Sequence, residues 1–365
     1  MKVPYNDLKR TTEILFPKFD KIFADCLYNN KFIGGSEIAK FEDNFTKTFD
    51  VKNVVSCGNG TDALIGALRA INLKPDDEVI IPAMTWISSA EVVNLVGAKP
   101  VFCDVDEHTM VAELKDIQAK ITNKTKAVIL VHLYGNMPIM APIIEYLNEL
   151  DIILIEDCAQ AHLSSYKGVT AGNFGRFGTF SFYPGKNLGA IGDAGAICAR
   201  DEFDAQYIRK FFNHGASKKH LHEVIGTNSR LDTLQASILT EKLAHLKLWT
   251  SERIKLAKIY ENELQECRTI SINEGVVNSF HIFPILVEDR AELLRYFDEM
   301  GIGYNINYPV PLHKQPCYKL HNNHKLPIAE MIAAQQVSLP LFPGMTESEQ
   351  QYVIDKLNLF FRSKK

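Results

Sequence analysis

Residues 53–70 read NVVSCGNGTDALIGALRA, in which a short apolar run leads through a Gly-Asn-Gly turn at 58–60 into a helical pattern. The apolar run predicts a strand over Asn53–Ser56. The spacing of the later apolar residues predicts a helix over Thr61–Ala70, capped by its first residue or by Asp62. Glycines let a ligand come close to the backbone, and a helix N-terminus offers free N–H groups that suit a phosphate. The stretch therefore predicts a strand–turn–helix unit with a candidate phosphate site.

Strand-like runs continue to alternate with helical patterns as far as residue 199. The further strands that we expect are Glu78–Pro82, Pro100–Asp104, Ala127–His132, Ile152–Ile155, Phe177–Tyr183 and Ala194–Ala199. The further helices that we expect are Ala90–Leu95, Glu113–Ile121 and Pro138–Glu149. This alternation predicts an α/β fold with a mostly parallel central sheet that helices cover on both faces. A glycine-rich stretch joins the last two strands instead of a helix, which predicts one antiparallel edge strand.

The pattern changes near Leu231. A long helical stretch from Thr233 to about Glu266 predicts one helix that leads out of the first domain. Beyond it, a strand over His281–Val287 and a helix over Ala291–Met300 predict a smaller α+β domain. Because 365 residues are many for one core, we expect a large domain over residues 1–245 and a small C-terminal domain over 246–365.

Composition narrows the function classes. The net charge is −4, so no basic excess indicates nucleic acid or an anionic membrane as partner. The seven cysteines are scattered without a C-x-x-C pair, which predicts a reduced, cytoplasmic protein with buried thiols. No apolar run reaches about 18 residues, so no membrane span is expected, and the charged N-terminus does not have the pattern of a signal peptide.

The glycine turn leaves two other interpretations open. Gly58, Gly60 and Ala63 fit the dinucleotide fingerprint G-x-G-x-x-G/A, which would make the chain a nicotinamide oxidoreductase. That fingerprint needs an acidic residue at the end of the second strand, whereas the acidic residues at 76–78 precede the strand or open it. The nicotinamide interpretation is therefore disfavoured. A plain strand-to-helix turn without a ligand is the remaining alternative.

A pair of acidic residues ends the apolar run at 152–160, which reads IILIEDCAQ. Ligand sites in open α/β sheets lie at the carboxyl ends of the strands, where Glu156 and Asp157 stand. A buried carboxylate needs a partner, and the protonated pyridine nitrogen of a cofactor is one such partner. A helix cap or an internal salt bridge would also explain the pair.

A single lysine stands in a glycine-rich setting at 178–196, which reads GTFSFYPGKNLGAIGDAGA. Lys186 follows a Pro-Gly turn and is flanked by small residues. A lysine that is desolvated in this way has a lowered pKa and can act as an amine nucleophile and base. The pattern G-x-x-x-x-G-K-[ST] is absent, because Asn187 follows the lysine and no glycine precedes Gly185 by five positions, which disfavours nucleotide hydrolysis.

Four motifs in order carry a resemblance to a known family: NGTDAL, EDCAQAH, SFYPGKNLGAIGDAGA and GTNSRLDTLQA. The chain resembles the DegT/StrS family of pyridoxal-phosphate (PLP) dependent sugar aminotransferases, which have the aspartate-aminotransferase (type I) fold. The similarity extends from VPYNDL and FIGGSEIAKFE near the N-terminus to YPVPLHKQPCY and SLPLFPGMTESE near the C-terminus. The resemblance implies a PLP enzyme that transfers an amino group to the keto group of a nucleotide-linked sugar.

The resemblance assigns roles in cofactor binding to eight residues, namely Gly60, Thr61, Trp86, Asp157, Gln160, Ser181, Lys186 and Asn228. Lys186 would form the internal Schiff base and move the proton, and Asp157 would pair with the pyridine nitrogen. Gln160 would contact the ring hydroxyl side, and Trp86 would cover the ring face. From the residues alone, Trp86 could equally be core packing and Gln160 a helix cap.

The remaining cofactor residues would bind the phosphate. Gly60, Thr61 and Ser181 would do so within one chain, although Ser181 could merely alternate outward in its strand. Asn228 would reach the phosphate of the neighbouring subunit, which implies a homodimer with shared active sites.

The resemblance also implies a substrate class. The expected amino donor is glutamate, and the acceptor is carbon 3 of a dTDP-linked 3-keto-6-deoxy hexose, for bacterial surface polysaccharide such as lipopolysaccharide O-antigen. A UDP-linked 3-keto sugar and amination at carbon 4 are the alternatives. The residues that we expect to contact the substrate are Tyr183, Lys219, Tyr308 and His313. The candidate cations for its diphosphate are Lys218, Lys219, His220, Arg230, His313 and Lys314.

Two details qualify the resemblance. Leu163 follows EDCAQAH where the family commonly has glycine. Relatives in which histidine replaces the lysine are dehydratases, so the presence of Lys186 favours transamination. A non-catalytic regulator that kept the fold is the rival class, and the intact Lys186, Asp157 and Ser181 disfavour it.

Overall fold

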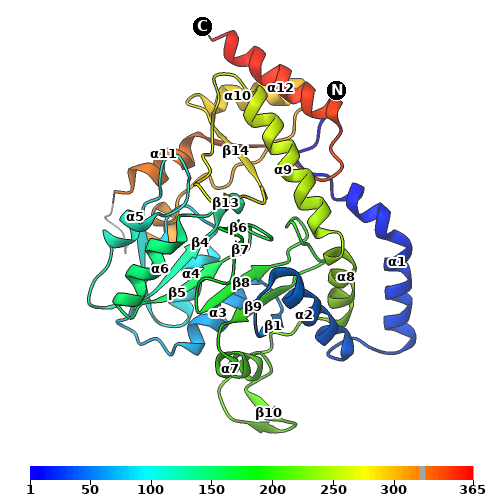
Figure 1. The fold of residues 1–365 in the computed structure, drawn as a ribbon, viewed down its shortest axis with the longest axis vertical. Coiled ribbons are helices and arrows are strands. Elements are labelled where there is room, and N and C mark those ends of the chain that lie inside the picture. Colours follow the sequence, from blue (N-terminus) through cyan, green and yellow to red (C-terminus); the bar gives the residue numbers. More distant parts are fainter. Residues whose placement is uncertain (320–324, 365) are drawn as a thin grey trace.

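The computed structural model describes residues 1–319 and 325–364, and a seven-stranded sheet lies at its centre (Figure 1). The order of the strands across the sheet is β1-β9-β8-β5-β4-β2-β3. Their bounds are β1 Val54–Cys57, β2 Glu78–Pro82, β3 Lys99–Cys103, β4 Thr125–Val131, β5 Ile153–Asp157, β8 Phe177–Ser181 and β9 Gly195–Ala199. The predicted α/β fold with a mostly parallel sheet is confirmed, and each predicted strand lies within about two residues of the observed one.

The antiparallel strand was predicted at an edge, and that position is wrong. β9 is antiparallel to both of its neighbours, but it lies between β1 and β8, so β1 forms the edge. This arrangement brings the start of β9 against the turn that follows β1. A Cβ atom at Gly195 would lie 2.4 Å from the backbone of Asn59, so only glycine fits there.

Helices cover this sheet. They are α3 Gly60–Ala70, α4 Ser88–Leu95, α5 Leu114–Gln118, α6 Met140–Glu149 and α7 Glu202–Phe212. The helix after β1 begins one residue earlier than predicted, and neither Thr61 nor Asp62 caps it. The cap is Asn59, whose side chain accepts a hydrogen bond from the backbone N–H of Asp62. The predicted helix over Glu113–Ile121 is shorter, because only Leu114–Gln118 is helical.

Two N-terminal helices, α1 Lys9–Tyr28 and α2 Ser36–Phe49, were not predicted. The inner face of α2 carries three fully buried phenylalanines, Phe41, Phe45 and Phe49. Their rings contact Phe180 of β8 and Phe182 just beyond it at centroid distances of 5.0–5.6 Å. This aromatic layer fixes β8, the strand that leads into the loop that carries Lys186, which we call the lysine loop.

The single long helix predicted from Thr233 is two helices, α8 Thr233–Leu243 and α9 Leu246–Glu263. The break lies at Ala244 and His245, whose residue types do not mark it. α8 packs on α1 and α2, whereas α9 packs on the C-terminal helix α12 Glu347–Arg362. The chain therefore changes direction where its packing partners change (Figure 1).

The C-terminal part is α+β, as predicted. Its three-stranded sheet has β14 Phe283–Leu286 between β12 Arg268–Thr269 and β15 Gln336–Leu339, with helices α10 Arg290–Met300 and α11 Pro327–Gln335. The small strands elsewhere are β6 Ser165–Tyr166, β7 Val169–Thr170 and β13 Val276–Val277, and the hairpin β10 Ala216–Lys218 with β11 Leu221–His222. The division at residue 245 stays a prediction, since the buried core is continuous across it.

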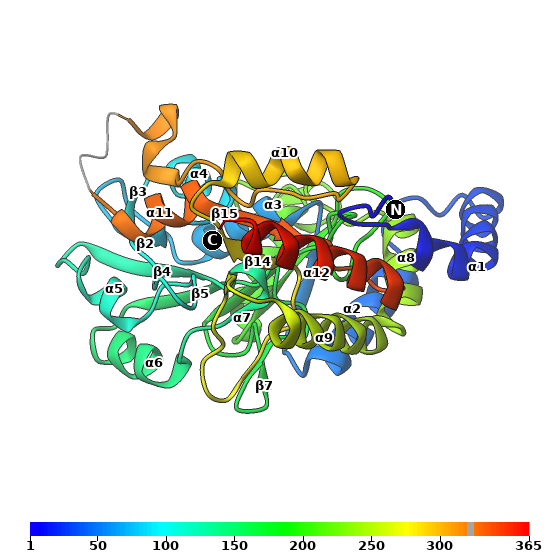
Figure 2. The same ribbon diagram turned by 90° about the horizontal axis from the view of Figure 1, so that it is seen from above.

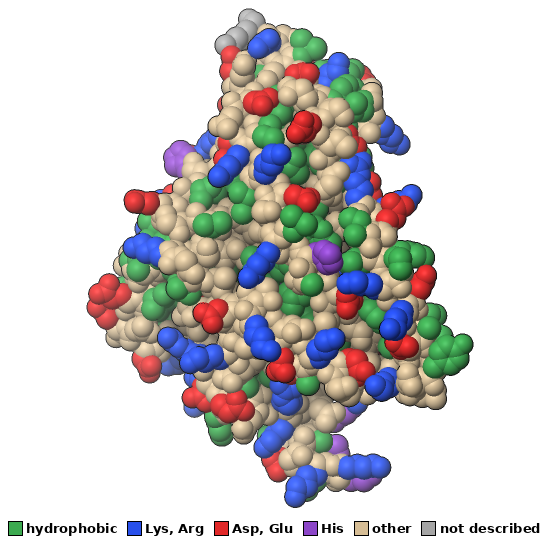
Figure 3. Space-filling view, turned by 45° about the vertical axis from the view of Figure 1, so that its right-hand side comes forward, with side chains coloured by type: hydrophobic (Ala, Val, Ile, Leu, Met, Phe, Trp, Pro, Cys, Tyr) green, Lys and Arg blue, Asp and Glu red, His purple; other side chains and the backbone are tan. Residues whose placement is uncertain are grey.

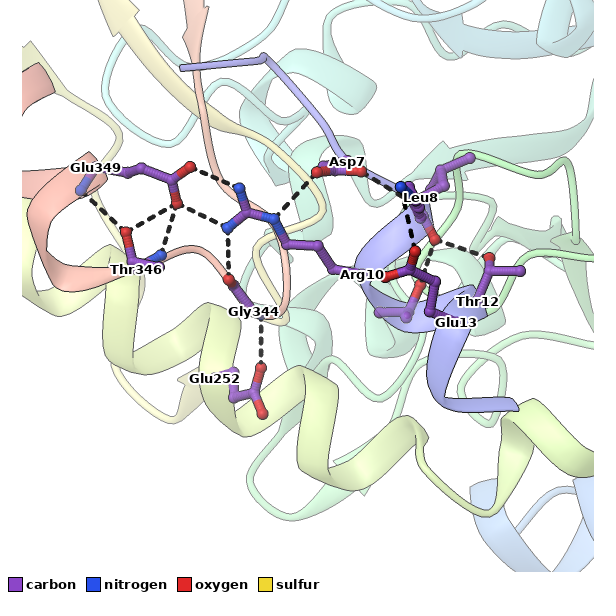
Figure 4. Close-up of polar contacts among 11 residues, drawn as sticks. Asp7, Leu8, Arg10, Thr12, Glu13, Glu252, Gly344, Thr346 and Glu349 are labelled. Atoms are coloured by element: carbon purple, nitrogen blue, oxygen red, sulfur yellow. Dashed lines mark hydrogen bonds and ion pairs between the residues drawn. The ribbon is translucent and has the colours of Figure 1, made fainter. Parts of the chain in front are cut away.

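The N-terminal segment lies beside α12 (Figure 2). Val3 pairs with Ile302, and the Arg10 guanidinium donates to both carboxylate oxygens of Glu349 at 2.6 and 2.7 Å (Figure 4). Arg10 also donates to the Gly344 carbonyl at 2.7 Å. The two ends of the chain are thereby fixed to each other.

Two composition predictions can be compared with the structure. All seven cysteines lie among the described residues, and none forms a disulfide in this structure. Five of them are buried, which agrees with the prediction of buried thiols. Within residues 1–319 and 325–364, no helix combines the length and the apolar character that crossing a bilayer requires.

Candidate active site

A cavity of about 560 Å³ opens at the carboxyl ends of the parallel strands, where ligand sites of such sheets lie. The start of α3, the loop before α4, the end of β5, the lysine loop and segments of the C-terminal part all reach it. The lining includes Gly60, Thr61, Trp86, Asp157, Gln160, Ser181, Tyr183, Lys186 and Tyr308. The structure therefore brings together seven of the eight predicted cofactor residues.

Lys186 stands at a tight turn on the cavity wall. Its backbone N–H donates to the Tyr183 carbonyl at 2.8 Å, which closes the turn through Pro184 and Gly185. Burial lowers the pKa of the Lys186 ammonium to about 8, although the nearby Asp157 carboxylate opposes the shift. A usable fraction of the amine is therefore neutral near pH 7, as a nucleophile or base requires.

The two acidic residues at the end of β5 face opposite ways. Asp157 lines the cavity and accepts hydrogen bonds from the Ser89 hydroxyl at 2.9 Å and the Ala159 N–H at 3.1 Å. Glu156 is fully buried and lies 2.8 Å from Nε2 of His132. The remaining partners of Glu156 are the backbone N–H groups of Gly172, Phe174 and Gly175. The internal salt bridge considered for the pair thus belongs to Glu156, and Asp157 is free to meet a ligand.

The start of α3 forms one end of the cavity. A Cβ atom at Gly60 would lie 2.7 Å from Cβ of Ser181, so a glycine is required where the helix approaches β8. The Thr61 hydroxyl lies 2.8 Å from the Ser88 hydroxyl. Free N–H groups, two hydroxyls and the positive end of a helix together make a site that fits a phosphate.

Gln160 and Trp86 form part of the wall between these groups. Oε1 of Gln160 accepts the Tyr134 N–H at 2.8 Å, and its Nε2 donates to the Tyr308 hydroxyl at 3.0 Å, so Gln160 is not a helix cap. Trp86 is 57% exposed, and its ring lies 5.5 Å from that of Tyr308. Trp86 is therefore not a core residue, and the alternative that it only packs in the core is wrong.

A lysine amine, a buried carboxylate and a helix N-terminus on one cavity fit the three functional parts of PLP, namely aldehyde, pyridine nitrogen and phosphate. Four uncharged polar residues on the same wall, Asn6, Ser89, Asn305 and Asn307, could hold the polar groups of a substrate.

Other predicted residues lie outside this cavity. Of the four predicted substrate contacts, Tyr183 and Tyr308 line it, whereas Lys219 and His313 do not. His313 is buried, and its Nε2 lies 3.0 Å from Glu330, which Lys314 also contacts. The remaining predicted residues are exposed and do not line this cavity, namely Lys218, Lys219, His220, Asn228 and Arg230.

Several lining residues were missed from the sequence. They are Tyr5, Asn6, Ser88, Ser89, Asp193, His281, Asn305 and Asn307. Tyr5 and Asn6 belong to the VPYNDL motif, which signalled resemblance but no role. Ser88 and Ser89 open α4, whereas Asp193, His281, Asn305 and Asn307 come from loops with no periodic pattern, so only the folded chain brings them to the site.

Leu163, which replaces the family's common glycine, has a φ of +63°. This is the left-handed region, where glycine meets no steric penalty. The backbone at Leu163 therefore adopts a conformation that glycine favours, with a leucine side chain in place.

The family model described as the DegT/DnrJ/EryC1/StrS aminotransferase family matches residues 16–358. Among curated proteins, the chain is 39% identical to a pleiotropic regulatory protein of Geobacillus stearothermophilus, over 99% of both chains. It is 36% identical to the dTDP-3-amino-3,4,6-trideoxy-α-D-glucose transaminase of Streptomyces venezuelae, over 97% of this chain and 95% of the other. It is 38% identical to the UDP-N-acetyl-3-dehydro-α-D-glucosamine 3-aminotransferase of Acidithiobacillus ferrooxidans, over 95% of both.

Solved structures agree with these matches. DesV of S. venezuelae, solved in complex with a ketimine intermediate, superposes with a TM-score of 0.95 at 36% identity, over 98% of each chain. NtdA of Bacillus subtilis, solved with the bound cofactor PMP, has a TM-score of 0.92 at 30% identity, over 100% of this chain and 86% of the other.

Proposed function

The chain belongs to the DegT/DnrJ/EryC1/StrS aminotransferase family and is a PLP-dependent aminotransferase, and on that premise we propose its substrates and the roles of its residues. The proposed reaction moves an amino group from glutamate to carbon 3 of a dTDP-linked 3-keto-6-deoxy hexose, for bacterial surface polysaccharide. The observation that carries the site assignment is the meeting of Lys186, Asp157 and the start of α3 on one cavity.

The names of two relatives support carbon 3. The sugar in the name of the S. venezuelae transaminase has its amino group on carbon 3, and the sugar in the name of the A. ferrooxidans aminotransferase has its keto group there. The first sugar is linked to dTDP and the second to UDP. Carbon 3 is therefore better supported than the nucleotide. The UDP-linked 3-keto sugar is the alternative that the proposal has to exclude.

The cavity residues would have separate roles in cofactor binding and proton transfer. When bound, PLP supplies an electron sink that lets an amino group leave one carbon and join another. Asp157 would hold the pyridine nitrogen protonated, while Gly60, Thr61 and Ser181 hold the phosphate. Nζ of Lys186, neutral in part because its pKa is about 8, would move the proton between the substrate carbon and the cofactor carbon.

We further propose that a second copy of the chain completes each site. The diphosphate and the glutamate carboxylates need cations, yet Lys186 is the only lysine or arginine among the described residues that line the cavity. Lysine and histidine side chains gather at the tip of the β10–β11 hairpin, at the lower end of the molecule in Figure 3. Exposed apolar side chains on α1, including Ile14, Phe16 and Phe23, would suit a surface that the second copy covers.

The function is tested by supplying glutamate with a dTDP-linked 3-keto-6-deoxy hexose and identifying the product by mass spectrometry and NMR. We expect an amino group at carbon 3 and one equivalent of 2-oxoglutarate. Lys186→Ala should lower turnover by roughly 10²–10⁴-fold while the protein stays folded. Faster turnover of the UDP-linked sugar, or an amino group at carbon 4, would contradict the proposed substrate but not the aminotransferase chemistry.

The shared site is tested by mixing two inactive variants, Lys186→Ala and Asn228→Asp, after unfolding and refolding them together. A mixed dimer has one site with both residues intact, so random pairing should restore about a quarter of the wild-type activity. Each variant refolded alone is the control. A mixture that stays as inactive as its parts would show that both residues serve the same chain's site.

A further inference from the structure

The loop that carries Lys186 is tied to the C-terminal part of the chain by Asn187. This side chain is buried; its Nδ2 donates to the Ser279 carbonyl at 3.2 Å, and its Oδ1 lies 3.1 Å from Nδ1 of His281. The Ser279 carbonyl can only accept, which fixes the orientation of the Asn187 amide. The amide oxygen that faces His281 can also only accept, so Nδ1 of His281 carries a proton.

His281 is held firmly while its ring faces the ligand. Its backbone carbonyl accepts a hydrogen bond from Nη1 of the buried Arg253 at 3.3 Å, and the same nitrogen donates to the Leu341 carbonyl at 2.9 Å. The half-buried ring lines the cavity together with Lys186. Among the described residues, Nε2 of His281 has no hydrogen-bond partner.

The imidazole of His281 is neutral. Burial lowers its pKa well below the ordinary value, and the cations of Lys186 and Arg253 lower it further. A neutral ring with its proton on Nδ1 carries a lone pair on Nε2. His281 is therefore a preorganised hydrogen-bond acceptor on the same cavity wall as an amine.

In this structure Lys186 and His281 line the same cavity without a hydrogen bond between them. We propose that the free amine, on its flexible side chain, turns to donate a hydrogen bond to Nε2 of His281, which points the nitrogen lone pair at the substrate carbon. His281 is then a positioning residue for the proton transfer, held in the correct tautomer by Asn187. The inference rests on the proposed role of Lys186 as the proton carrier.

Other titratable groups near the amine are already engaged or differently placed. Asp157 is held by Ser89 and Ala159, and it is the carboxylate reserved for a ligand. His162 is packed among phenylalanine rings, and burial lowers its pKa to about 3. The remaining titratable groups on the cavity wall are Tyr5, Asp193, Tyr183 and Tyr308. Variants at His281 leave all of these unchanged.

Two variants separate the two ring nitrogens. His281→Asn keeps an N–H that can donate to Asn187 but has no atom at the Nε2 position. His281→Gln can place its amide oxygen near the Nε2 position, so it keeps an acceptor for the amine. The pKa of Lys186 is measured in the full-length protein without cofactor, by competitive acylation with acetic anhydride across pH and mass spectrometry of the peptide that contains Lys186.

Loss of the acceptor destabilises the ammonium form, so His281→Asn should lower the pKa of Lys186 by about one, and His281→Gln should keep the wild-type value. A merely structural role would admit water and raise the pKa toward its ordinary value instead. In the holoenzyme, His281→Asn should lower kcat about tenfold with KM nearly unchanged, because orientation is lost and binding is not.

Several results would overturn the inference. One is an unchanged or raised pKa of Lys186 in His281→Asn, and another is equal kcat loss in the asparagine and glutamine variants. If His281→Asn does not fold by thermal unfolding, Asn187→Ala replaces it, because the ring can then carry its proton on either nitrogen and the same drop in kcat is expected. A wild-type Lys186 with its ordinary pKa would instead remove the proposed role of Lys186 itself.

Discussion

At the scale of single residues, Glu156 and Asp157 show how adjacent carboxylates acquire different tasks. Successive side chains of a strand point to opposite sides, so one reaches the core and the other the cavity. Glu156 accepts four hydrogen bonds in the core, whereas Asp157 accepts two and keeps a face toward the ligand. The sequence predicted an acidic pair at a strand end. The residues alone could not assign the two roles, because the strand was predicted to stop at Ile155, and only the family resemblance selected Asp157 for the pyridine nitrogen.

Replacing each carboxylate by its amide should therefore affect a different property, namely turnover for Asp157 and stability for Glu156. Asp157→Asn removes the charge at the cavity and should lower kcat by at least about 10²-fold with little loss of stability. Glu156→Gln forces an NH₂ group against N–H donors and should cost about 3 kcal/mol of unfolding free energy. Turnover assays and urea unfolding on both variants measure this. A stable Glu156→Gln or an active Asp157→Asn would contradict the assignment.

At the scale of elements, the sequence located strands better than helix ends. Strands were found because apolar runs are bounded by polar and glycine residues. The cap of α3 was misplaced because Asn59 lies inside the glycine turn, where it was counted as a turn residue. The break between α8 and α9 was missed because tertiary packing causes it, and Ala244 and His245 are compatible with a continuous helix.

The cap of α3 should matter for the ligand as well as for the helix. Asn59→Ala should lower the unfolding free energy by about 1 kcal/mol and also weaken cofactor binding, because the first turn of α3 forms a wall of the cavity. Asp289→Ala is the matched control, since Asp289 caps α10 away from the cavity. Both variants should lose similar stability, and equilibrium dialysis should show weaker binding only for Asn59→Ala. Equal cofactor affinity in the two variants would contradict this.

At the scale of the whole molecule, the contact between the two ends of the chain should make stability depend on pH. The Arg10 guanidinium holds the pKa of Glu349 at about 2, with help from hydrogen bonds of Thr346. Because the folded pKa is below the unfolded one, the stabilisation is complete above about pH 5 and is lost as pH falls toward 2. The loss should be about 2 kcal/mol, since both side chains are mostly buried. Glu330, paired with His313 and Lys314, takes up its proton over the same range of falling pH, because its pKa is also about 2.

Thermal unfolding at pH 7, 5, 4 and 3 isolates the contribution of the contact. Wild type and Glu349→Gln should differ in Tm at pH 7, and the difference should narrow between pH 5 and pH 3 without closing, because the folded pKa of Glu349 is about 2. Glu330→Gln, measured in parallel, accounts for the second carboxylate. A Tm difference that stays constant over this range would show that the charge of Glu349 contributes nothing.

The resemblance of short motifs predicted the cavity and its main residues, but not how the chain ends take part in it. Tyr5 and Asn6 line the active-site cavity. Arg10, only a few residues later, donates hydrogen bonds to Glu349 of the last helix, α12. A change to either end of the chain is therefore a change close to the active-site cavity. A purification tag fused ahead of Met1 would lie close to Tyr5 and Asn6, and a stop codon placed before Glu347 would remove the partner of Arg10. Either change should disturb the part of the cavity wall that the N-terminal segment forms.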